Sequence, residues 1–315
     1  MFFQNSAKTD ALGQQMVRYI VQQFGPIGLS DDSFSLTLLL HPLDSSRMFG
    51  AESALPVGYS YRGNAPFYPC SVVKMFILAA AQAAILYGRV VKTPALERAM
   101  HDMIKWSSNT ATNYVIDILT DTTGDTELES SEMEAWVKAR NGINVYLQSL
   151  GLLEFEDINI CQKLMDDDRY GREKIFVRWG GNNHNRLTTH ATASMMARIM
   201  EGDMVSPECS QQMANFLCRP RDSAFMQVSG AQVLGYLGEK LPADVRIWSK
   251  AGWTGWTRDP LASYRRHDAI HVSLPQGPRF TLAVFTEGQK ASQDDTMLPL
   301  IGKQACELLA EAFPA

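Results

Sequence analysis

The sequence has few cysteines and no strong excess of charge of either sign. Its 315 residues include five cysteines, at positions 70, 161, 209, 218 and 306, which form neither a metal-ligand spacing nor an even set for disulfides. Lysine and arginine number 29 against 34 aspartates and glutamates, and the net charge of −5 provides no basic stripe for nucleic acid. No apolar run is long enough to span a bilayer. These absences argue against a disulfide-rich, nucleic-acid-binding or membrane-spanning protein.

The N-terminal segment also lacks a recognisable export signal. Residues 1–8 contain no charged region followed by an apolar region, so the chain as given predicts a cytoplasmic protein, in agreement with its scattered cysteines. Removal of a leader would instead make the location periplasmic or extracellular. The six histidines form no metal-ligand pattern, and we expect no metal and no other cofactor. We expect a monomer or weak homo-oligomer that acts on a small molecule or peptide, with no nucleic-acid or membrane partner.

Hydrophobic periodicity predicts an α/β region that is interrupted by a helical region. With 45% hydrophobic residues the chain can bury a large core. The strands expected from β-branched and leucine-rich runs are 34–41, a strand or hairpin ending at 61, 245–250, 267–274 and 279–286, with a turn at 275–278. The expected helices are 11–24, 71–87, 94–104, 110–119, 144–150 and 299–313, together with one that opens at 185–189. The acidic, threonine-rich residues 120–131 predict a loop.

The first candidate for chemistry is the S-x-x-K motif that joins Ser71 to Lys74. If this segment is helical, both side chains face the same way, because they lie one turn apart. A neutral lysine can then take the hydroxyl proton as the serine attacks a substrate. The apolar residues 75–81 predict a buried helix, and burial lowers a lysine pKa. Cys70 is interpreted as a small buried residue behind the site, since no histidine lies nearby to activate a thiol.

Two later segments add to this motif. In the first, Ser107 is a candidate proton relay and Asn109 a candidate ligand for a substrate amide, although such residues also serve as ordinary helix N-caps. In the second, a strand-like run ends at Lys250, and Gly252 lets a ligand approach the backbone. Lys250 alone is equally consistent with a solvated strand end. The three segments together favour a catalytic site.

In this order, residues 71–74, 107–109 and 250–252 resemble the signature of the serine β-lactamase and penicillin-binding protein superfamily. The flanking residues 103–104, 185–189 and 267–270 resemble its class A-related branch. The resemblance runs from about residue 34 to the C-terminus. It implies an α+β fold in which helices flank a five-stranded antiparallel sheet beside an all-helical lobe. We assign residues 1–65 and 191–315 to the sheet domain and 66–190 to the helical domain, with the active site in the cleft between them.

The sequence departs from class A β-lactamases where the deacylating water would be activated. The stretch 173–185 has no clear E-x-x-L-N box, so Glu173 is a possible deacylation base, and Asp166, Asp167 or Asp168 are substitutes. Ser108 replaces an aspartate of the second motif, and Ala251 replaces a threonine of the third. Without that hydroxyl, a substrate carboxylate would need another donor. The candidates are Arg258, Arg265 and Arg266.

These observations predict a serine hydrolase that forms an acyl-enzyme on an amide or ester. Ser71 is the expected nucleophile and Lys74 its base, while Ser107 and Lys250 pass the proton to the leaving group. The backbone N–H groups of Ser71 and Trp253 would form the oxyanion hole. The expected substrate-binding residues are Asn109, Ser249, Ala251, Gly252, Trp253, Arg265 and Arg266. Two alternatives stay open: a true β-lactamase, and a penicillin-binding or sensor-like module that acylates without efficient turnover.

Overall fold

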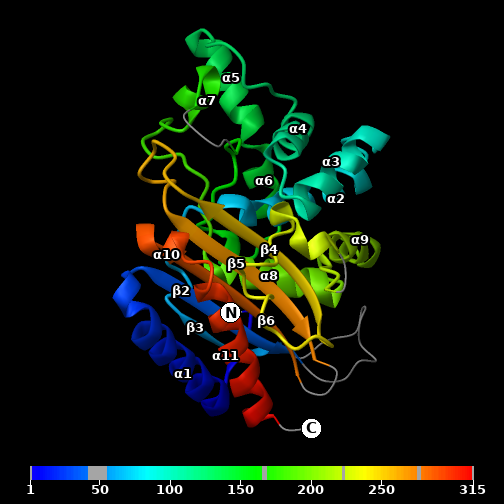
Figure 1. Ribbon diagram of the computed structural model, residues 1–315. Helices are drawn as coiled ribbons and strands as arrows, with labels where there is room; N and C mark the ends of the chain where they lie inside the picture. Colours follow the sequence, from blue (N-terminus) through cyan, green and yellow to red (C-terminus); the bar gives the residue numbers. More distant parts are fainter. Residues whose placement is uncertain (1, 42–54, 165–168, 222–223, 275–277, 314–315) are drawn as a thin grey trace.

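The computed structural model of the protein describes residues 2–41, 55–164, 169–221, 224–274 and 278–313. A single sheet of six strands forms its centre, in the order β1-β3-β2-β6-β5-β4 (Figure 1). The strands are β1 (Gln4–Asn5), β2 (Phe34–His41), β3 (Val57–Tyr61), β4 (Arg246–Thr254), β5 (Arg265–Ser273) and β6 (Arg279–Glu287). Neighbouring strands pair antiparallel except β1, which pairs parallel with β3.

Eleven helices are present in the described part of the chain. They are α1 (Ala7–Phe24), α2 (Lys74–Leu86), α3 (Pro94–Lys105), α4 (Asn109–Thr120), α5 (Ser130–Arg140), α6 (Gly142–Ser149), α7 (Gly171–Phe176), α8 (Thr189–Glu201), α9 (Pro207–Leu217), α10 (Gln289–Gln293) and α11 (Met297–Ala312). Short 3₁₀ turns lie at Gly25–Ile27, Cys70–Val73, Leu153–Phe155, Ala224–Gln227 and Ser229–Ala231. None of these helices is both long and apolar enough to cross a bilayer.

Hydroxyl side chains fix where several helices begin. Ser6 accepts a hydrogen bond from the Thr9 N–H before α1, and Thr93 does the same for the Leu96 N–H before α3. Ser108 caps α4 in this way, through the Ala111 N–H. Each cap satisfies a backbone donor that the helix itself leaves without a partner. The capping interpretation of the second motif therefore holds for Ser108.

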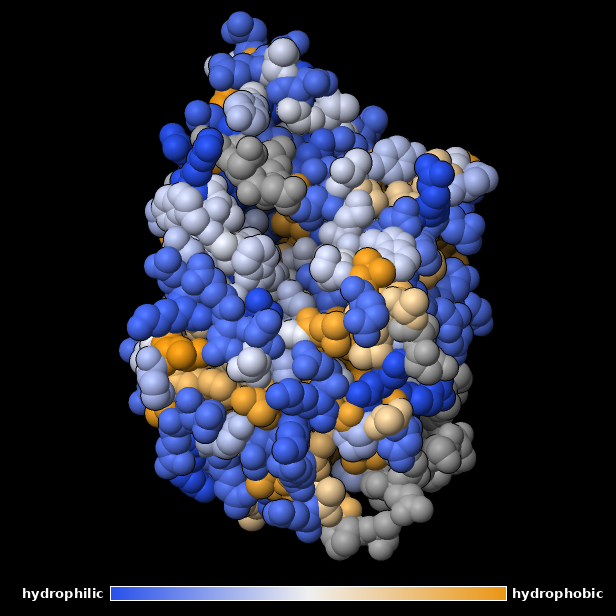
Figure 2. All heavy atoms as spheres, in the orientation of Figure 1, coloured by the Kyte–Doolittle hydropathy of each residue, from blue (hydrophilic) through white to orange (hydrophobic). Residues whose placement is uncertain are grey.

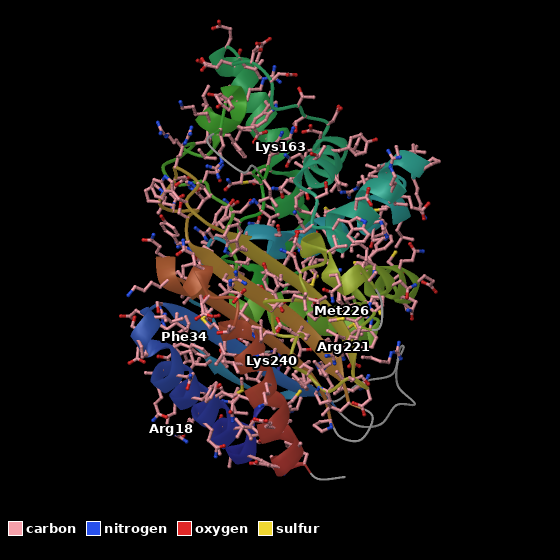
Figure 3. The ribbon with its side chains drawn as sticks, viewed as in Figure 1. Arg18, Phe34, Lys163, Arg221, Met226 and Lys240 are labelled. Carbon is pink, nitrogen blue, oxygen red and sulfur yellow. The ribbon has the colours of Figure 1, made fainter. Side chains whose placement is uncertain are left out.

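Helices cover both faces of the sheet. On one face α1 and α11 pack on alternate residues of β2, so that Leu36 and Leu38 share a core with Met16 and Ile301. On the other face α8 packs against the same sheet, and the core that it joins also contains α2. Figure 3 shows Phe34 at the buried start of β2 and Arg18 on the exposed side of α1.

The second core continues from the sheet into the helical part. It contains Leu39, Ala283 and Phe285 of the sheet together with apolar residues of α2, α3, α4, α6 and α9. Nearly all of α2 is buried, including Phe76 and Leu78. The helix that begins at the proposed nucleophile is therefore held on several sides by packing. The division into domains at residues 66 and 190 stays a prediction.

The predicted fold class is confirmed, with one change in the sheet. The expected count of five strands was wrong, because β1 adds a sixth strand by pairing with Val57 and Gly58 of β3. A two-residue strand has too few positions to show any periodicity. The helices α5, α7, α9 and α10 were also not predicted, and α5 begins at the end of the segment expected to be a loop. Residues 275–277 of the expected turn, and residues 42–54 of the stretch expected to form a strand or hairpin ending at 61, lie outside the described residues.

Candidate active site

A cavity of about 440 Å³ lies at the start of α2, beside the end of β4. Its walls come from four segments that are far apart in the sequence. The lining residues are Tyr68, Cys70, Ser71, Asn109, Leu164, Trp253, Thr254, Gly255, Trp256 and Thr257. Figure 2 shows this face of the molecule hollowed between the helices at the top of the view and the sheet below. The cavity thus brings together Ser71 and Asn109 of the first two predicted motifs with Trp253, which directly follows the third.

The backbone before Ser71 is held in an unusual conformation. Cys70 has a φ of 50°, in the left-handed region that L-residues rarely adopt. The turn is supported from β5, where His267 Nε2 lies 2.9 Å from the Tyr68 carbonyl and His267 Nδ1 accepts the Thr286 N–H at 3.0 Å. Burial lowers the pKa of His267 to about 3, so the ring is neutral and donates through Nε2. His267 therefore positions the strained turn that presents Ser71.

Lys74 reaches from the first turn of α2 to the second motif. Its Nζ lies 2.5 Å from the Ser107 carbonyl, 3.2 Å from Ser107 Oγ and 2.8 Å from Asn109 Oδ1. Ser107 has a φ of 53°. This left-handed residue lies directly before the N-cap of α4, and both its carbonyl and its hydroxyl contact Lys74. The structure thus connects the first two motifs through a fully buried lysine.

Lys250 approaches the same hydroxyl from β4. Its Nζ lies 3.0 Å from Ser107 Oγ, 2.5 Å from Gln232 Oε1 and 2.7 Å from the Ala251 carbonyl. The side chain is completely buried. Ser107 Oγ is therefore placed between two lysine amines, one from each neighbouring motif.

This arrangement favours one neutral amine. A hydroxyl has a single proton to donate, and two ammonium groups beside it would both be donors, leaving that proton no acceptor within the trio. Burial, with the charges of Lys74 and Arg219, lowers the pKa of Lys250 well below its usual value. The site therefore supplies a neutral amine that can accept a proton from Ser107.

Gly252 lets the edge strand β4 touch the start of α2. A Cβ added at Gly252 would lie 2.7 Å from the Ser71 backbone nitrogen and 2.8 Å from Cys70 Cβ. Both distances are shorter than van der Waals contact, so a side chain at this position would force the strand away. The absence of a side chain brings the backbone that leads into Trp253 next to the nucleophile.

Four predicted binding residues lie elsewhere. Ser249 contacts Arg219, whose Nε is 3.3 Å from Ser249 Oγ, and the Ala251 side chain is buried in the core beneath the sheet. Arg265 pairs with Glu287 at 3.2 Å. Arg266 donates to the Ser292 carbonyl at 2.9 Å and to the Gly235 carbonyl at 3.0 Å. None of the four lines the cavity that contains Ser71.

Residues 87–309 match the model of a beta-lactamase enzyme family. The chain belongs to this family. The match covers more than half of the chain but begins after Ser71 and Lys74. The first motif is therefore supported by the contacts of Lys74 with Ser107 and Asn109, and not by the family match. The resemblance to the serine β-lactamase and penicillin-binding protein superfamily is confirmed.

Solved structures agree with this assignment of the fold. A beta-lactamase from Sphaerobacter thermophilus DSM 20745 is 18% identical, with a TM-score of 0.63 over 94% of this chain and 98% of that one. The protein PBP-A is also 18% identical, with a TM-score of 0.60 over 98% of each chain. A point mutant of PBP-A, solved as an acyl-enzyme complex with penicillin G, is 19% identical, with a TM-score of 0.59 over 96% of this chain and 97% of that one. No curated protein matches the chain at a significant level.

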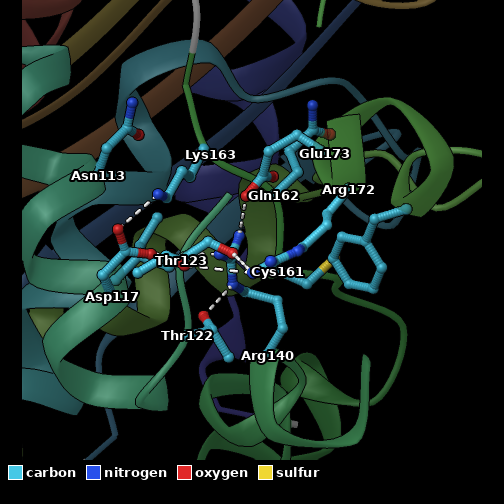
Figure 4. A network of polar contacts seen from close by, with 12 residues as sticks. Asn113, Asp117, Thr122, Thr123, Arg140, Cys161, Gln162, Lys163, Arg172 and Glu173 are labelled. Carbon is cyan, nitrogen blue, oxygen red and sulfur yellow. Dashed lines mark hydrogen bonds and ion pairs between the residues drawn. The ribbon is translucent and has the colours of Figure 1, made fainter. Parts of the chain in front are cut away.

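In this family member Glu173 belongs to a buried network away from the cavity lining (Figure 4). Glu173 Oε1 pairs with Arg140 Nη1 at 2.6 Å, and both side chains are at most 1% exposed. Arg140 also contacts Asp117 at 3.2 Å and Thr122 at 2.8 Å. The proposed substitutes, residues 166–168, lie outside the described residues. Glu173 thus has a structural partner that accounts for its burial.

This pairing predicts a large effect of Glu173→Gln on stability. Removing one charge of a buried pair costs about 3–5 kcal/mol of unfolding free energy, and we expect the lower end because Asp117 still pairs with Arg140. Urea denaturation measures the change. Glu132→Gln, at an exposed carboxylate of α5, is the matched control and should shift by less than about 0.5 kcal/mol. Unaltered stability combined with a trapped acyl-enzyme would instead make Glu173 the deacylating base.

Several residues of the beta-lactamase-family site carried no signal in the sequence. Gln232 and Arg219 come from segments without periodicity, yet they contact Lys250 and Ser249. His267 was noted only as part of a strand. No group of three or more metal-binding side chains occurs among the described residues. A sequence pattern can identify residues that lie close together in one motif. The contacts of Gln232, Arg219 and His267 join distant segments, so they form only when the chain has folded.

Proposed function

We propose that this protein is a serine hydrolase that forms an acyl-enzyme on an amide or ester. One observation carries the proposal. Ser107 Oγ lies 3.2 Å from Lys74 Nζ and 3.0 Å from Lys250 Nζ, beside a cavity lined by Ser71. A chain of amine, hydroxyl and amine can move a proton to and from a nucleophile without a histidine.

The proposed reaction begins with a proton transfer through this chain. A proton that leaves Lys74 by way of Ser107 for Lys250 makes Lys74 neutral, and the lowered pKa of Lys250 provides the neutral amine that receives it. Ser71 Oγ then attacks the substrate carbonyl and gives its proton to Lys74. The backbone N–H groups of Ser71 and Trp253 would stabilise the oxyanion.

The second step expels the leaving group. A proton passes from Lys250 through Ser107 to the departing nitrogen or oxygen, and the carbonyl re-forms as an ester of Ser71. The proton on Lys74 then moves through Ser107 to Lys250, which leaves Lys74 neutral. Water then attacks this ester and gives a proton to neutral Lys74, which passes it to Ser71 Oγ as the bond between that oxygen and the acyl carbon breaks. One bond of the substrate is thereby cleaved by the addition of one water molecule.

The cavity wall offers two tryptophans to the acyl group of a substrate. Trp253 and Trp256 are 47% and 57% exposed at its rim, and Trp256 stacks on Tyr264 with ring centroids 5.9 Å apart. Such aromatic surfaces bind an apolar or planar acyl group. Because Glu173 pairs with Arg140, we propose that hydrolysis of a penicillin acyl group is slow. An acylating module without turnover is the second candidate, for the same reason.

A stopped-flow trace with a chromogenic cephalosporin tests the proposal. We expect a burst of about one equivalent followed by little turnover, because acylation needs only the chain of Lys74 and Ser107 while deacylation needs a water beside a bulky acyl group. A linear p-nitrophenyl ester should be turned over repeatedly. Ser71→Ala should show neither the burst nor the ester turnover.

Three other results would contradict the proposed function. Sustained turnover of the cephalosporin at the rate of a resistance enzyme would identify a true β-lactamase. A burst with the ester as well as with the cephalosporin, and no turnover of either, would favour the acylating module. No adduct on any serine with either compound would reject the acyl-enzyme.

A further inference from the structure

A second cavity, of about 250 Å³, lies next to the candidate active site. The two cavities share a wall, because Thr257 lines the first and its neighbour Arg258 lines the second. A further contact joins them across the chain. The ring of Tyr68, in the first cavity, lies 6.3 Å from the ring of His184, in the second, in an edge-on arrangement.

The second cavity has an excess of positive charge. The charged residues that line it are Arg169, Lys174, Arg178, Arg258 and Asp259. Among the described residues that line the cavity, four cations thus face one carboxylate, in a chain whose net charge is −5. Like charges gathered around one concavity repel each other, and an anion bound among them would relieve that repulsion.

The carboxylate of Asp259 is already paired with groups of the protein. Asp259 Oδ2 accepts from Arg169 Nη1 at 2.9 Å and lies 2.6 Å from His184 Nε2. Asp259 Oδ1 accepts the Leu261 N–H at 3.0 Å. The carboxylate of Asp259 is therefore already hydrogen-bonded to groups of the protein. Within the described part of the chain, Lys174, Arg178 and Arg258 make no salt bridge to any carboxylate.

The loop that carries Arg258 is held rigidly. Thr257 N–H donates to Ser263 Oγ at 2.9 Å, and Ser263 Oγ donates to the Asp259 carbonyl at 2.7 Å. Arg258 itself has a φ of 63° and is exposed. A strained backbone inside a hydrogen-bonded loop fixes the direction of the Cα–Cβ bond from which this exposed side chain extends.

We propose that this cavity binds an anionic group, a carboxylate or phosphate, at the far end of the substrate's acyl chain. The proposal rests on the proposed acyl-enzyme reaction, because it places the acyl carbonyl at Ser71 and the anion at Arg178 and Arg258. Guanidinium groups suit both anions, since each offers paired N–H donors. The substrate class is thus an ester or amide of an acid that carries a second, negatively charged end.

Matched ester pairs test this specificity. Each pair consists of two separate p-nitrophenyl esters of the same diacid: succinic, glutaric, adipic or suberic acid. In one ester the second carboxylate is free, and in the other it is a methyl ester. We expect kcat/KM for the best acidic ester to exceed that of its capped partner by about tenfold, as one charge-assisted interaction provides. The double variant Arg178→Gln, Arg258→Gln should bring that ratio close to one. Arg89→Gln, at an exposed arginine after α2, should leave it unchanged.

An experiment with a free anion tests whether the cavity binds the charged end of the substrate or a separate anionic ligand. Inorganic pyrophosphate should compete with the acidic ester and bind the protein in calorimetry, and the double variant should weaken this binding. A ratio near one at every chain length would overturn the proposal, even if pyrophosphate binds, because the site would then serve a free anion. An unchanged ratio in the double variant would overturn it as well.

Failure of the proposed function gives a different result. If no ester labels Ser71 in intact-mass spectra, the acyl-enzyme reaction is rejected. Calorimetry with pyrophosphate then tests the cavity by itself. Binding that depends on Arg178 and Arg258 would retain the anion site, whereas absence of binding would reject both.

Discussion

Ser71→Ala should abolish covalent labelling of the protein by fluorophosphonates and penicillins. Ser71 is the hydroxyl that the cavity presents at the start of α2, with its backbone nitrogen next to Gly252. Without this oxygen no ester can form, and loss of the nucleophile in serine hydrolases reduces kcat by about a millionfold. Intact-mass spectrometry at short and long times measures the adduct directly.

Two neighbouring groups provide the controls for this experiment. Cys70→Ala should still be labelled, because burial raises the pKa of the Cys70 thiol to about 12 and removes its thiolate at neutral pH. Ser107→Ala should be labelled slowly, since the relay is lost but the nucleophile remains. An adduct that peptide mapping places on Ser107 or Cys70 would refute the mechanism.

Lys74→Arg should be nearly inactive although it keeps the positive charge. Arginine stays protonated in proteins, so it cannot accept the Ser71 proton, and its planar group does not fit the three contacts that Lys74 makes with Ser107 and Asn109. We expect kcat/KM for a p-nitrophenyl ester to fall by at least about a hundredfold, as for loss of a general base.

The same substitution at an exposed lysine separates chemistry from folding. Lys92, whose side chain is 39% exposed, is the matched control, and Lys92→Arg should retain wild-type turnover. Circular dichroism should show that both variants fold. Wild-type-like turnover of Lys74→Arg would show that Lys74 is structural and would leave Lys250 as the base.

Helices and strands whose residues show a regular apolar pattern were predicted close to their observed bounds. β2 was predicted at its observed bounds because its leucine-rich run is buried on both faces, and α3 was predicted to within one residue. β4 was expected to end at Lys250 but continues to Thr254, because Gly252 and Trp253 interrupt the apolar pattern that marks a strand. Pairing with β5 keeps these residues extended.

The same distinction applies to the candidate site: residues within a motif were predicted, and contacts between distant segments were not. The three motifs identified Ser71, Lys74, Ser107 and Lys250, whose spacing within the chain carries the signal. Arg265 and Arg266 were expected to bind a substrate carboxylate, yet the structure pairs them with Glu287 and the Ser292 carbonyl. A positive charge in a sequence does not reveal its partner. Arg258 was a third candidate for that carboxylate, but its place in a cationic cavity with Arg178 was not predicted, since the two lie 80 residues apart.

The central place of β2 in the sheet has a consequence for synthesis of the chain on the ribosome. β2 pairs with β6, and Leu36 opposes Val284, a residue made 248 positions later. At roughly 5–20 residues per second, Leu36 waits about 12–50 s for this partner. Meanwhile the helices between residues 74 and 217 can form through local contacts. β3 is made soon after β2 and can cover one edge of this apolar strand, but the edge that pairs with β6 stays open through most of translation. A chaperone that shields nascent chains would have its main task at that edge.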